Sequence, residues 1–223
     1  MSDIREASLE PGADRLPGGV LLQIVPFLIL ALGGLWLAAN WDQLPARLPV
    51  HWNWRGEIDH TVARSVPGAA LPLLLGASVC LMMLGMQIGI RHGAPRAPTR
   101  ASMLKVLLAG EFFVAFICCG ILASTVTGGR LLAPVLAGCF AGVAAMLIVT
   151  WLLVRNAPRA ALRNPAAWHA GFIYVDRTDP AIFVPKRLGV GYTFNFGHPL
   201  ALVMAFGFLV IPLLAVLLAL TVR

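Results

Sequence analysis

Residues 44–59 read LPARLPVHWNWRGEID and separate two long apolar segments, residues 20–40 and 68–90. The stretch contains two prolines, a histidine, an asparagine, a glycine and an aspartate, whereas the flanking segments have few polar side chains. Proline disfavours a helix here, and lipid would leave the backbone of an irregular loop without hydrogen-bond partners. We therefore expect a polar loop outside the hydrocarbon, between two membrane-spanning helices.

The composition of the whole chain is that of a membrane protein. Its 223 residues are 59% hydrophobic and 12% charged, with a mean hydropathy of +0.82, whereas a soluble domain is about 25% charged. An apolar run of about 18 or more residues is long enough to cross the bilayer, and inside lipid it must be helical. The expected fold class is therefore an all-α integral membrane protein with five transmembrane helices. The five segments are residues 20–40, 68–90, 104–126, 132–154 and 200–222.

The distribution of basic residues predicts the orientation of the chain. Twelve of the 17 Lys and Arg residues lie in segments on the same side as the N-terminus, and five lie on the other side. Because basic residues concentrate in cytoplasmic loops, we predict the N-terminus inside and the C-terminus outside. The same flanking residues account for the net charge of +7, so we expect membrane lipids and no nucleic acid as partners. The acidic leader favours a retained first helix over a cleaved signal peptide.

The connectors divide the chain into four parts. The basic connector at residues 91–103 is expected to be irregular, and the short connector at residues 127–131 predicts a tight turn between antiparallel helices. The four parts are an N-terminal helix pair (1–103) with an extracytoplasmic motif loop (41–67), a helical hairpin (104–154), a cytoplasmic insert (155–199) and a C-terminal transmembrane helix (200–223).

The cytoplasmic insert carries strand patterns. Residues 171–175 and 181–185 are rich in β-branched and aromatic side chains and flank the turn-forming sequence DRTDP, which predicts a hairpin. Farther on, Val190, Tyr192, Phe194 and Phe196 alternate with small or polar residues, as in a half-buried strand. We expect a small β-hairpin or meander, with its aromatic face against the helix ends or the lipid headgroups.

A few polar residues lie within the predicted spans. Gln23, Gln87 and Glu111 all fall in the cytoplasmic half under the predicted orientation. An ionisable residue in the hydrocarbon costs about 2.5–3.5 kcal/mol on insertion scales, which makes Glu111 the strongest single candidate. Two interpretations stay open: a carboxyl hydrogen-bonded to Gln23 or Gln87 that serves helix packing, or a proton or ligand site open to the cytoplasm.

The outer motif loop suggests a second site. His51 and Asn53 are two residues apart and would point the same way in an extended segment, and Asp59 and His60 follow a turn at Gly56. Imidazole and carboxylate groups suit zinc or another divalent metal, so His51, Asp59 and His60 are candidate ligands. A hydrogen-bonded cap over the bundle and a recognition surface for a peptide or lipid are the alternatives.

Other signatures of catalysis are missing from the sequence. It contains no HExxH, GxSxG, GxxxxGK[ST] or GxGxxG pattern, so the case for an enzyme is weak and stays open. The four cysteines lie in apolar segments without a CxxC pair, so we expect buried thiols rather than disulfides. Gly138 and Gly142 form a GxxxG pattern, which we expect to serve helix packing within the chain.

Two blocks of the sequence resemble known domains. Residues 44–59 follow the pattern LPxxxPxHWNxxGxxD, which resembles a widespread bacterial membrane domain that also occurs in SdpI-type immunity and signalling proteins. Residues 174–199 are similar to a second domain that often follows the first, with the pattern YxNxxDPxxFVPKRxGxGxTxNF; here Asp176 stands where that pattern has Asn. The resemblance implies a multi-pass protein of the bacterial inner membrane, with immunity or signalling as the role of one branch.

The leading functional hypothesis is a non-enzymatic membrane sensor or immunity-type protein. Its outer loop would engage an extracytoplasmic peptide or envelope component, and its insert would engage a cytoplasmic protein. The competing hypotheses are a small transporter or metal-dependent intramembrane enzyme, and a structural subunit of a larger assembly. The candidate binding residues are His51, Asn53, Gly56 and Asp59 in the outer loop, Gln23, Gln87 and Glu111 in the spans, and Asp179, Lys186, Arg187 and Asn195 in the insert.

Overall fold

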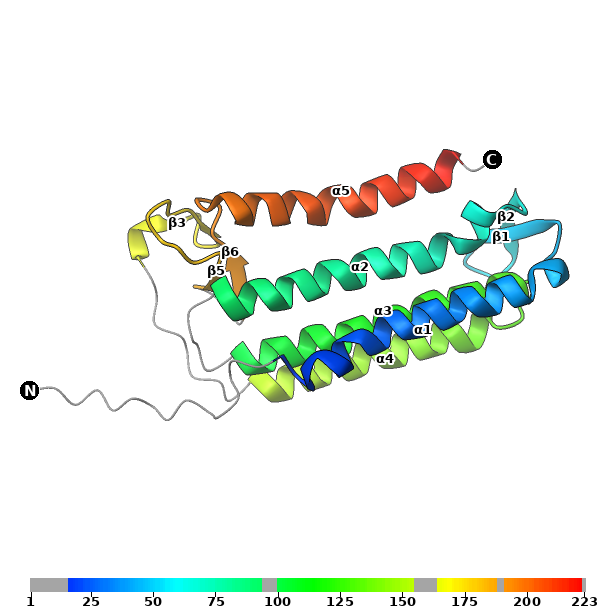
Figure 1. The fold of residues 1–223 in the computed structure, drawn as a ribbon, viewed down its shortest axis with the longest axis horizontal. Helices are drawn as coiled ribbons and strands as arrows, with labels where there is room; N and C mark the ends of the chain where they lie inside the picture. The colour runs from blue at the N-terminus through cyan, green and yellow to red at the C-terminus, as the bar shows by residue number, and fades with distance from the viewer. Residues whose placement is uncertain (1–15, 94–99, 155–163, 188–190, 222–223) are drawn as a thin grey trace, which may run out of the picture.

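The computed structural model describes residues 16–93, 100–154, 164–187 and 191–221, and these form an elongated helical bundle with β elements at both ends (Figure 1). We call these ends the hairpin end, which carries β1 and β2, and the insert end, which carries β3–β6. The long helices of the described residues are α1 (Gly19–Ala39), α2 (Val66–Gly93), α3 (Arg100–Val126), α4 (Leu132–Val154) and α5 (Pro199–Thr221).

Four of these helices, α1 to α4, are long and apolar enough to cross a membrane. At a rise of 1.5 Å per residue, the 21 residues of α1 span roughly 32 Å, which matches the hydrocarbon thickness of about 30 Å. The prediction of a mostly helical, multi-pass membrane protein is therefore confirmed for four spans. The fifth predicted span coincides with α5, an apolar helix of 23 residues.

The expected connector at residues 91–103 is partly wrong. Helix α2 continues to Gly93 and α3 begins at Arg100, so the helices extend into both ends of this segment, while residues 94–99 lie outside the described residues. Arg91 and His92 occupy the last turn of α2, where basic side chains interact favourably with the helix dipole. A basic composition therefore prolongs this helix instead of ending it.

Helix α3 packs against α1, α2 and α4. Its seam with α4 is made by glycines that accept aromatic rings: Gly142 lies against Phe113, and a Cβ on Gly138 would lie 3.0 Å from Cζ of Phe116. The GxxxG pattern thus packs within the chain, as predicted. The turn between the two helices also forms where expected, with Gly128 and Gly129 at positive φ angles of 63° and 88°.

Substituting Gly142 by leucine is expected to separate α4 from α3. The new side chain would occupy the position of the Phe113 ring, and overpacking of this kind costs about 1–3 kcal/mol. Thermal unfolding in detergent micelles measures the effect. Gly85→Leu is the matched control, because a Cβ on Gly85 meets nothing within 4 Å; equal melting temperatures for the two variants would contradict the described seam.

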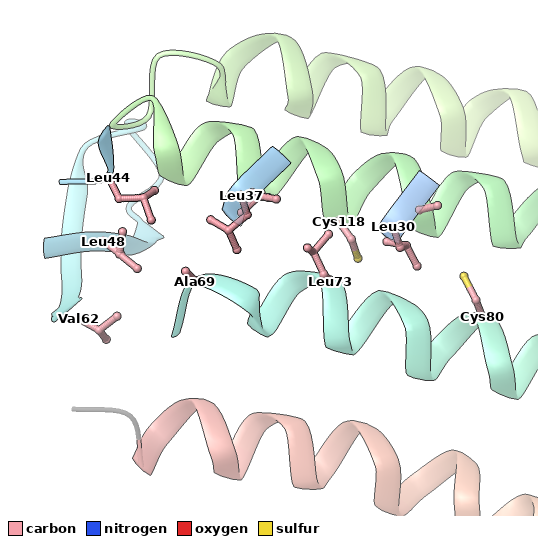
Figure 2. Packing of buried hydrophobic residues seen from close by; sticks show 11 residues of the cluster. Leu30, Leu37, Leu44, Leu48, Val62, Ala69, Leu73, Cys80 and Cys118 are labelled. Carbon is pink, nitrogen blue, oxygen red and sulfur yellow. The ribbon is translucent and has the colours of Figure 1, made fainter. Parts of the chain in front are cut away.

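The hairpin end closes one end of the bundle. Strand β1 (Arg47–Trp52) pairs antiparallel with β2 (Ile58–Ala63), and the short 3₁₀ helix η1 (Trp41–Gln43) links α1 to it. Leu48 is fully buried and, with Leu44 and Val62, joins the core cluster that includes Leu37 of α1 and Ala69 of α2 (Figure 2). The hairpin therefore covers this end of the helices with apolar side chains, and the choice among a metal site, a cap and a recognition surface stays a prediction.

The pairing of β1 with β2 is interrupted at Val50. The register steps from Pro49 opposite Thr61 to His51 opposite His60, so Val50 is unpaired, and a second shift follows between His51 and Trp52. Such bulges break the alternation of side chains. Because β1 ends at Trp52, Asn53 lies in the turn outside the strand, so the common face expected for His51 and Asn53 in an extended segment stays a prediction.

The insert end consists of short elements. The 3₁₀ helix η2 (Pro165–Ala167) leads into β3 (Trp168–His169), which pairs with β4 (Ile173–Tyr174). The other pair is β5 (Phe183–Pro185) with β6 (Tyr192–Phe194). The expected hairpin across residues 176–180 is therefore wrong, because β4 and β5 each pair with another strand.

The predicted aromatic strand forms in part: β6 covers Tyr192–Phe194, whereas Phe196 lies in the turn that follows. Phe194 of β6 contacts Phe183 of β5, with ring centroids 4.8 Å apart, and both pack near Ile90 at the end of α2. Val190, which was included in the predicted strand, falls outside the described residues.

Candidate functional site

The turn of the hairpin is built around the Asn53 side chain. Its Oδ1 accepts hydrogen bonds from the backbone N–H groups of Arg55 (2.9 Å) and Glu57 (3.0 Å), and its Nδ2 donates to Oε2 of Glu57 (2.8 Å). Gly56 has a φ angle of 80°, a conformation that side chains other than glycine rarely adopt. The motif residues Asn53 and Gly56 therefore specify the turn.

His51 and Asp59 face each other across the hairpin. His51 Nδ1 lies 2.6 Å from Oδ1 of Asp59, and the two side chains are 66% and 43% exposed. A His–Asp contact this exposed contributes little to stability.

The predicted metal site is brought together only in part. His60 lies opposite His51 in the strand register, but the described residues contain no group of three or more His, Cys, Asp or Glu side chains able to hold a metal ion. All residues of the hairpin are described, and of the three candidate ligands only His51 and Asp59 are in contact there. Metal binding by His51, Asp59 and His60 stays a prediction.

The tip of the hairpin exposes an aromatic residue. The Trp54 side chain is 87% exposed, and the Arg55 guanidinium lies over its ring at 4.7 Å from the centroid. Val50 and Ile58 are also exposed large apolar residues on the hairpin. Together with the His51–Asp59 pair they form what we call the hairpin surface, which combines apolar, basic and hydrogen-bonding groups.

Two residues that the sequence analysis did not single out hold the hairpin in place, Arg64 across its base and Thr125 from the bundle. Arg64 donates from Nη1 to the backbone oxygen of Leu44 (3.0 Å), and Thr125 of α3 donates from Oγ1 to the backbone oxygen of Pro49 (3.4 Å). A Ser–Thr pair at the end of an apolar span is the signal that would have pointed to Thr125.

A second cluster is buried among α1, α2 and α3. Gln23, Gln87 and Glu111 are 3%, 0% and 0% exposed. The two glutamines exchange hydrogen bonds: Gln23 Nε2 donates to Gln87 Oε1 (3.3 Å), and Gln87 Nε2 donates to Gln23 Oε1 (3.1 Å). Gln87 Nε2 also donates to Glu111 Oε1 at 2.7 Å. The structure therefore joins the three intramembrane residues that the sequence singled out.

The insert is organised by Asn195. This side chain is fully buried, accepts at Oδ1 from the backbone N–H groups of Asp176 and Gly197 (3.0 Å each), and donates from Nδ2 to the backbone oxygens of Asp176 (2.8 Å), Asp179 (3.1 Å) and Ala181 (3.1 Å). Asp179 is likewise turned inward, accepting from the Tyr174 hydroxyl (3.0 Å) and the Ala181 N–H (2.9 Å). Asn195 and Asp179 thus hold the loop between β4 and β5 in place.

Asp176 caps the same loop from the surface. Its Oδ1 accepts from the Thr178 hydroxyl (2.6 Å) and N–H (2.9 Å), and its Oδ2 accepts from Asn164 (2.9 Å). These hydrogen bonds lower the pKa of Asp176 to about 2, and the bond from the Thr178 side chain has the largest effect. They do so because they stabilise the charged form of the carboxylate. Lys186 and Arg187, the other predicted binding residues of the insert, are exposed.

Two segments of the chain match known family models. Residues 28–76 match a domain of unknown function (DUF1648), and residues 177–202 match a family of unknown function (DUF5808). The first of these domains is associated with SdpI-like membrane proteins. No curated protein and no solved structure matches the chain. The chain is therefore a multi-pass membrane protein that carries two domains of unknown function. The first matched segment includes the strands of the hairpin end, and the second includes β5 and β6 of the insert end.

Proposed function

We propose that the protein is a non-enzymatic sensor of the bacterial inner membrane, in which the hairpin surface recognises an extracytoplasmic peptide or envelope component and the insert passes the signal to a cytoplasmic protein. The observation that carries this proposal is that a single helix, α2, is attached to both matched segments. It begins at Val66, shortly after β2 ends at Ala63, and its other end contacts the insert. In this proposal α5 is the fifth span and the N-terminus is cytoplasmic, as the basic residues predict.

The attachment of α2 at the hairpin end is tight. Ala69 of α2 is 1% exposed and shares the core cluster with Leu48 and Val62 of the two strands. Arg64, in the short link between β2 and α2, binds the backbone of Leu44 on the other side of the hairpin. A ligand that shifts the strands would therefore also shift the first turn of α2, since packed interfaces move as units.

At the insert end, α2 is attached to β5 through a close contact between Gly89 and the Phe183 ring. A Cβ on Gly89 of α2 would lie 2.7 Å from Cε2 of Phe183, so the aromatic ring rests directly on the helix backbone. Phe183 is 1% exposed and Ile90, next on the helix, is fully buried. A displacement of this end of α2 would therefore reach β5.

Both ends offer exposed groups to partners. The hairpin surface presents Trp54, the His51–Asp59 pair and neighbouring apolar side chains. The insert presents Lys186 and Arg187 beside the strand pair, and Phe172 is 66% exposed. Aromatic and arginine side chains are the groups enriched at protein interfaces, which supports recognition as the role of these surfaces.

Coupling between the two ends is testable by hydrogen exchange in lipid nanodiscs. Gly89→Leu is expected to displace Phe183 and to raise amide exchange by several-fold in β5 and also in β1 and β2, at the far end of α2. Exchange in α4, which packs on α3, should stay unchanged. Gly85→Leu, one turn earlier and with nothing within 4 Å of its Cβ, is the control and should alter neither end.

Exchange changes confined to the insert in Gly89→Leu would overturn the proposed coupling. The orientation is tested separately in intact cells with a membrane-impermeant maleimide, using Trp54→Cys and Lys186→Cys in a background without the native cysteines. Labelling of Trp54→Cys alone is expected. If both positions are labelled, the division into an outer and an inner surface is wrong.

A further inference from the structure

The buried cluster of Gln23, Gln87 and Glu111 leaves one carboxyl oxygen without a hydrogen-bond partner. Gln87 uses its Nε2 hydrogens on Glu111 Oε1 and Gln23 Oε1, and Gln23 uses its own on Gln87 Oε1 and the backbone oxygen of Pro17 (3.2 Å). Both amide oxygens also accept a bond. Among the described residues Glu111 Oε2 has no partner, although it is fully buried. The two glutamines have no donor left to offer it.

The surroundings of Glu111 contain no compensating charge within the described residues. The titratable group that contacts it is Cys80 of α2, whose thiol donates to the Glu111 backbone oxygen at 3.6 Å. From α1 the cluster receives Gln23, and from α4 the neighbouring Gly110 faces Met146. On α3 itself, Lys105 is exposed. An ionised Glu111 would therefore be a buried, unpaired charge, a situation that proteins resolve by taking up a proton.

We propose that Glu111 is an intramembrane proton-binding site, with Gln87 holding its carbonyl oxygen and Oε2 carrying the proton. The hydrogen-bond pattern assigns the two oxygens, because Oε1 accepts from Gln87 and Oε2 is the atom without a donor. On uptake the carboxylate takes one proton from water, and on release it returns that proton to water. The site is distinct from both exposed surfaces and does not depend on the sensor function.

The polar contacts also indicate the side from which protons arrive. The chain of hydrogen bonds runs from Glu111 through Gln87 and Gln23 to the backbone oxygen of Pro17. Pro17 is half-buried and precedes α1, whose first turn lies toward the insert end (Figure 1). At the hairpin end the same helices are closed by the apolar core cluster around Leu37, Leu48 and Ala69. Water therefore has its shortest polar route to Glu111 from the insert end.

Infrared spectroscopy of the whole protein in phosphatidylcholine nanodiscs tests this site. At neutral pH we expect a protonated carboxyl C=O band that shifts on labelling the glutamates with ¹³C at the carboxyl carbon and is lost in Glu111→Gln. The band should disappear at alkaline pH. In Gln87→Leu it should persist at higher wavenumber, because the carbonyl oxygen has lost its hydrogen-bond donor; a glutamine serving only packing would not produce this displacement.

Two results would overturn the proposal. The first is an ionised Glu111 at neutral pH, seen as a carboxylate band that is lost in Glu111→Gln instead of a protonated one. The second is a band whose disappearance follows the sodium concentration at constant pH, which would identify a cation site. The isotope shift in the wild-type protein reads the protonation state even if Glu111→Gln fails to fold, since Glu57, the other described glutamate, is exposed.

Discussion

Asn195→Leu is expected to unfold the insert while leaving the helical bundle intact. The substitution keeps the number and branching of the side-chain heavy atoms but removes five hydrogen bonds to backbone groups. Four of them reach the loop between β4 and β5, and the fifth reaches Gly197 after β6. Two of the orphaned groups are part-buried N–H donors. The loss of a partner costs at most about 1–3 kcal/mol for each, so the local stability should fall by up to roughly 2–6 kcal/mol. The effect is measured as the amide hydrogen-exchange rates of residues 173–187, compared with those of α3 in the same protein.

Asn164→Leu provides the control for this experiment. Its side chain also bonds to the backbone and to Asp176, at 3.3 Å to the N–H of Ala166 and 2.9 Å to Oδ2 of Asp176, but it is exposed. Water replaces lost hydrogen bonds at an exposed site, so we expect a change of less than about 1 kcal/mol. Wild-type exchange rates in Asn195→Leu would show that the insert does not depend on this residue.

The second large effect is expected from Leu48→Ala at the hairpin end. The Leu48 side chain is fully buried within the core cluster formed by β1, α1, α2 and α3. Truncation of a buried leucine to alanine costs about 2–5 kcal/mol, from lost burial and from the cavity left behind. The melting temperature in detergent micelles should fall, and amides of β1 and β2 should exchange faster.

Val50→Ala is the matched control on the same strand. Val50 is 41% exposed because the bulge turns it away from the core. We expect its melting temperature to stay close to that of the wild type. If Val50→Ala proves as damaging as Leu48→Ala, the face assignment of β1 is incorrect.

The sequence predicted the spans well because composition alone identifies them. A segment of some 20 apolar residues has to be helical in lipid whatever it packs against, and α4 begins at Leu132 and ends at Val154 as predicted. The helix ends at the basic connector were missed, since Arg91 and Arg100 extend helices without a hydropathy signal.

The strand pairing of the insert was missed for a different reason. Its pairs contain only two or three residues each, so local pattern carries little information about partners. Their arrangement depends on Asn195, whose side chain binds backbone groups 14 to 19 residues earlier. Likewise, the motif indicated that His51 and Asp59 could meet across a turn, but it gave no sign of the bulge at Val50.

The buried site was predictable in its members but not in its geometry. Gln23, Gln87 and Glu111 lie at similar depth in antiparallel spans, which the sequence established. Whether three side chains on three helices face one another depends on the rotation of each helix about its axis, and long apolar helices with few polar residues do not encode that rotation in a hydrophobic period.

The reciprocal amide pair of Gln23 and Gln87 restricts how α1 and α2 can move. Sliding one helix past the other by a single residue, about 1.5 Å, would strain both members of a pair whose bonds are already 3.3 and 3.1 Å long. A piston-like stroke is therefore unfavourable. Tilting about the pair keeps both bonds, so the two glutamines act as a pivot, and any motion that links the membrane faces should be a lever-like swing of α2 with opposite displacements at its two tips.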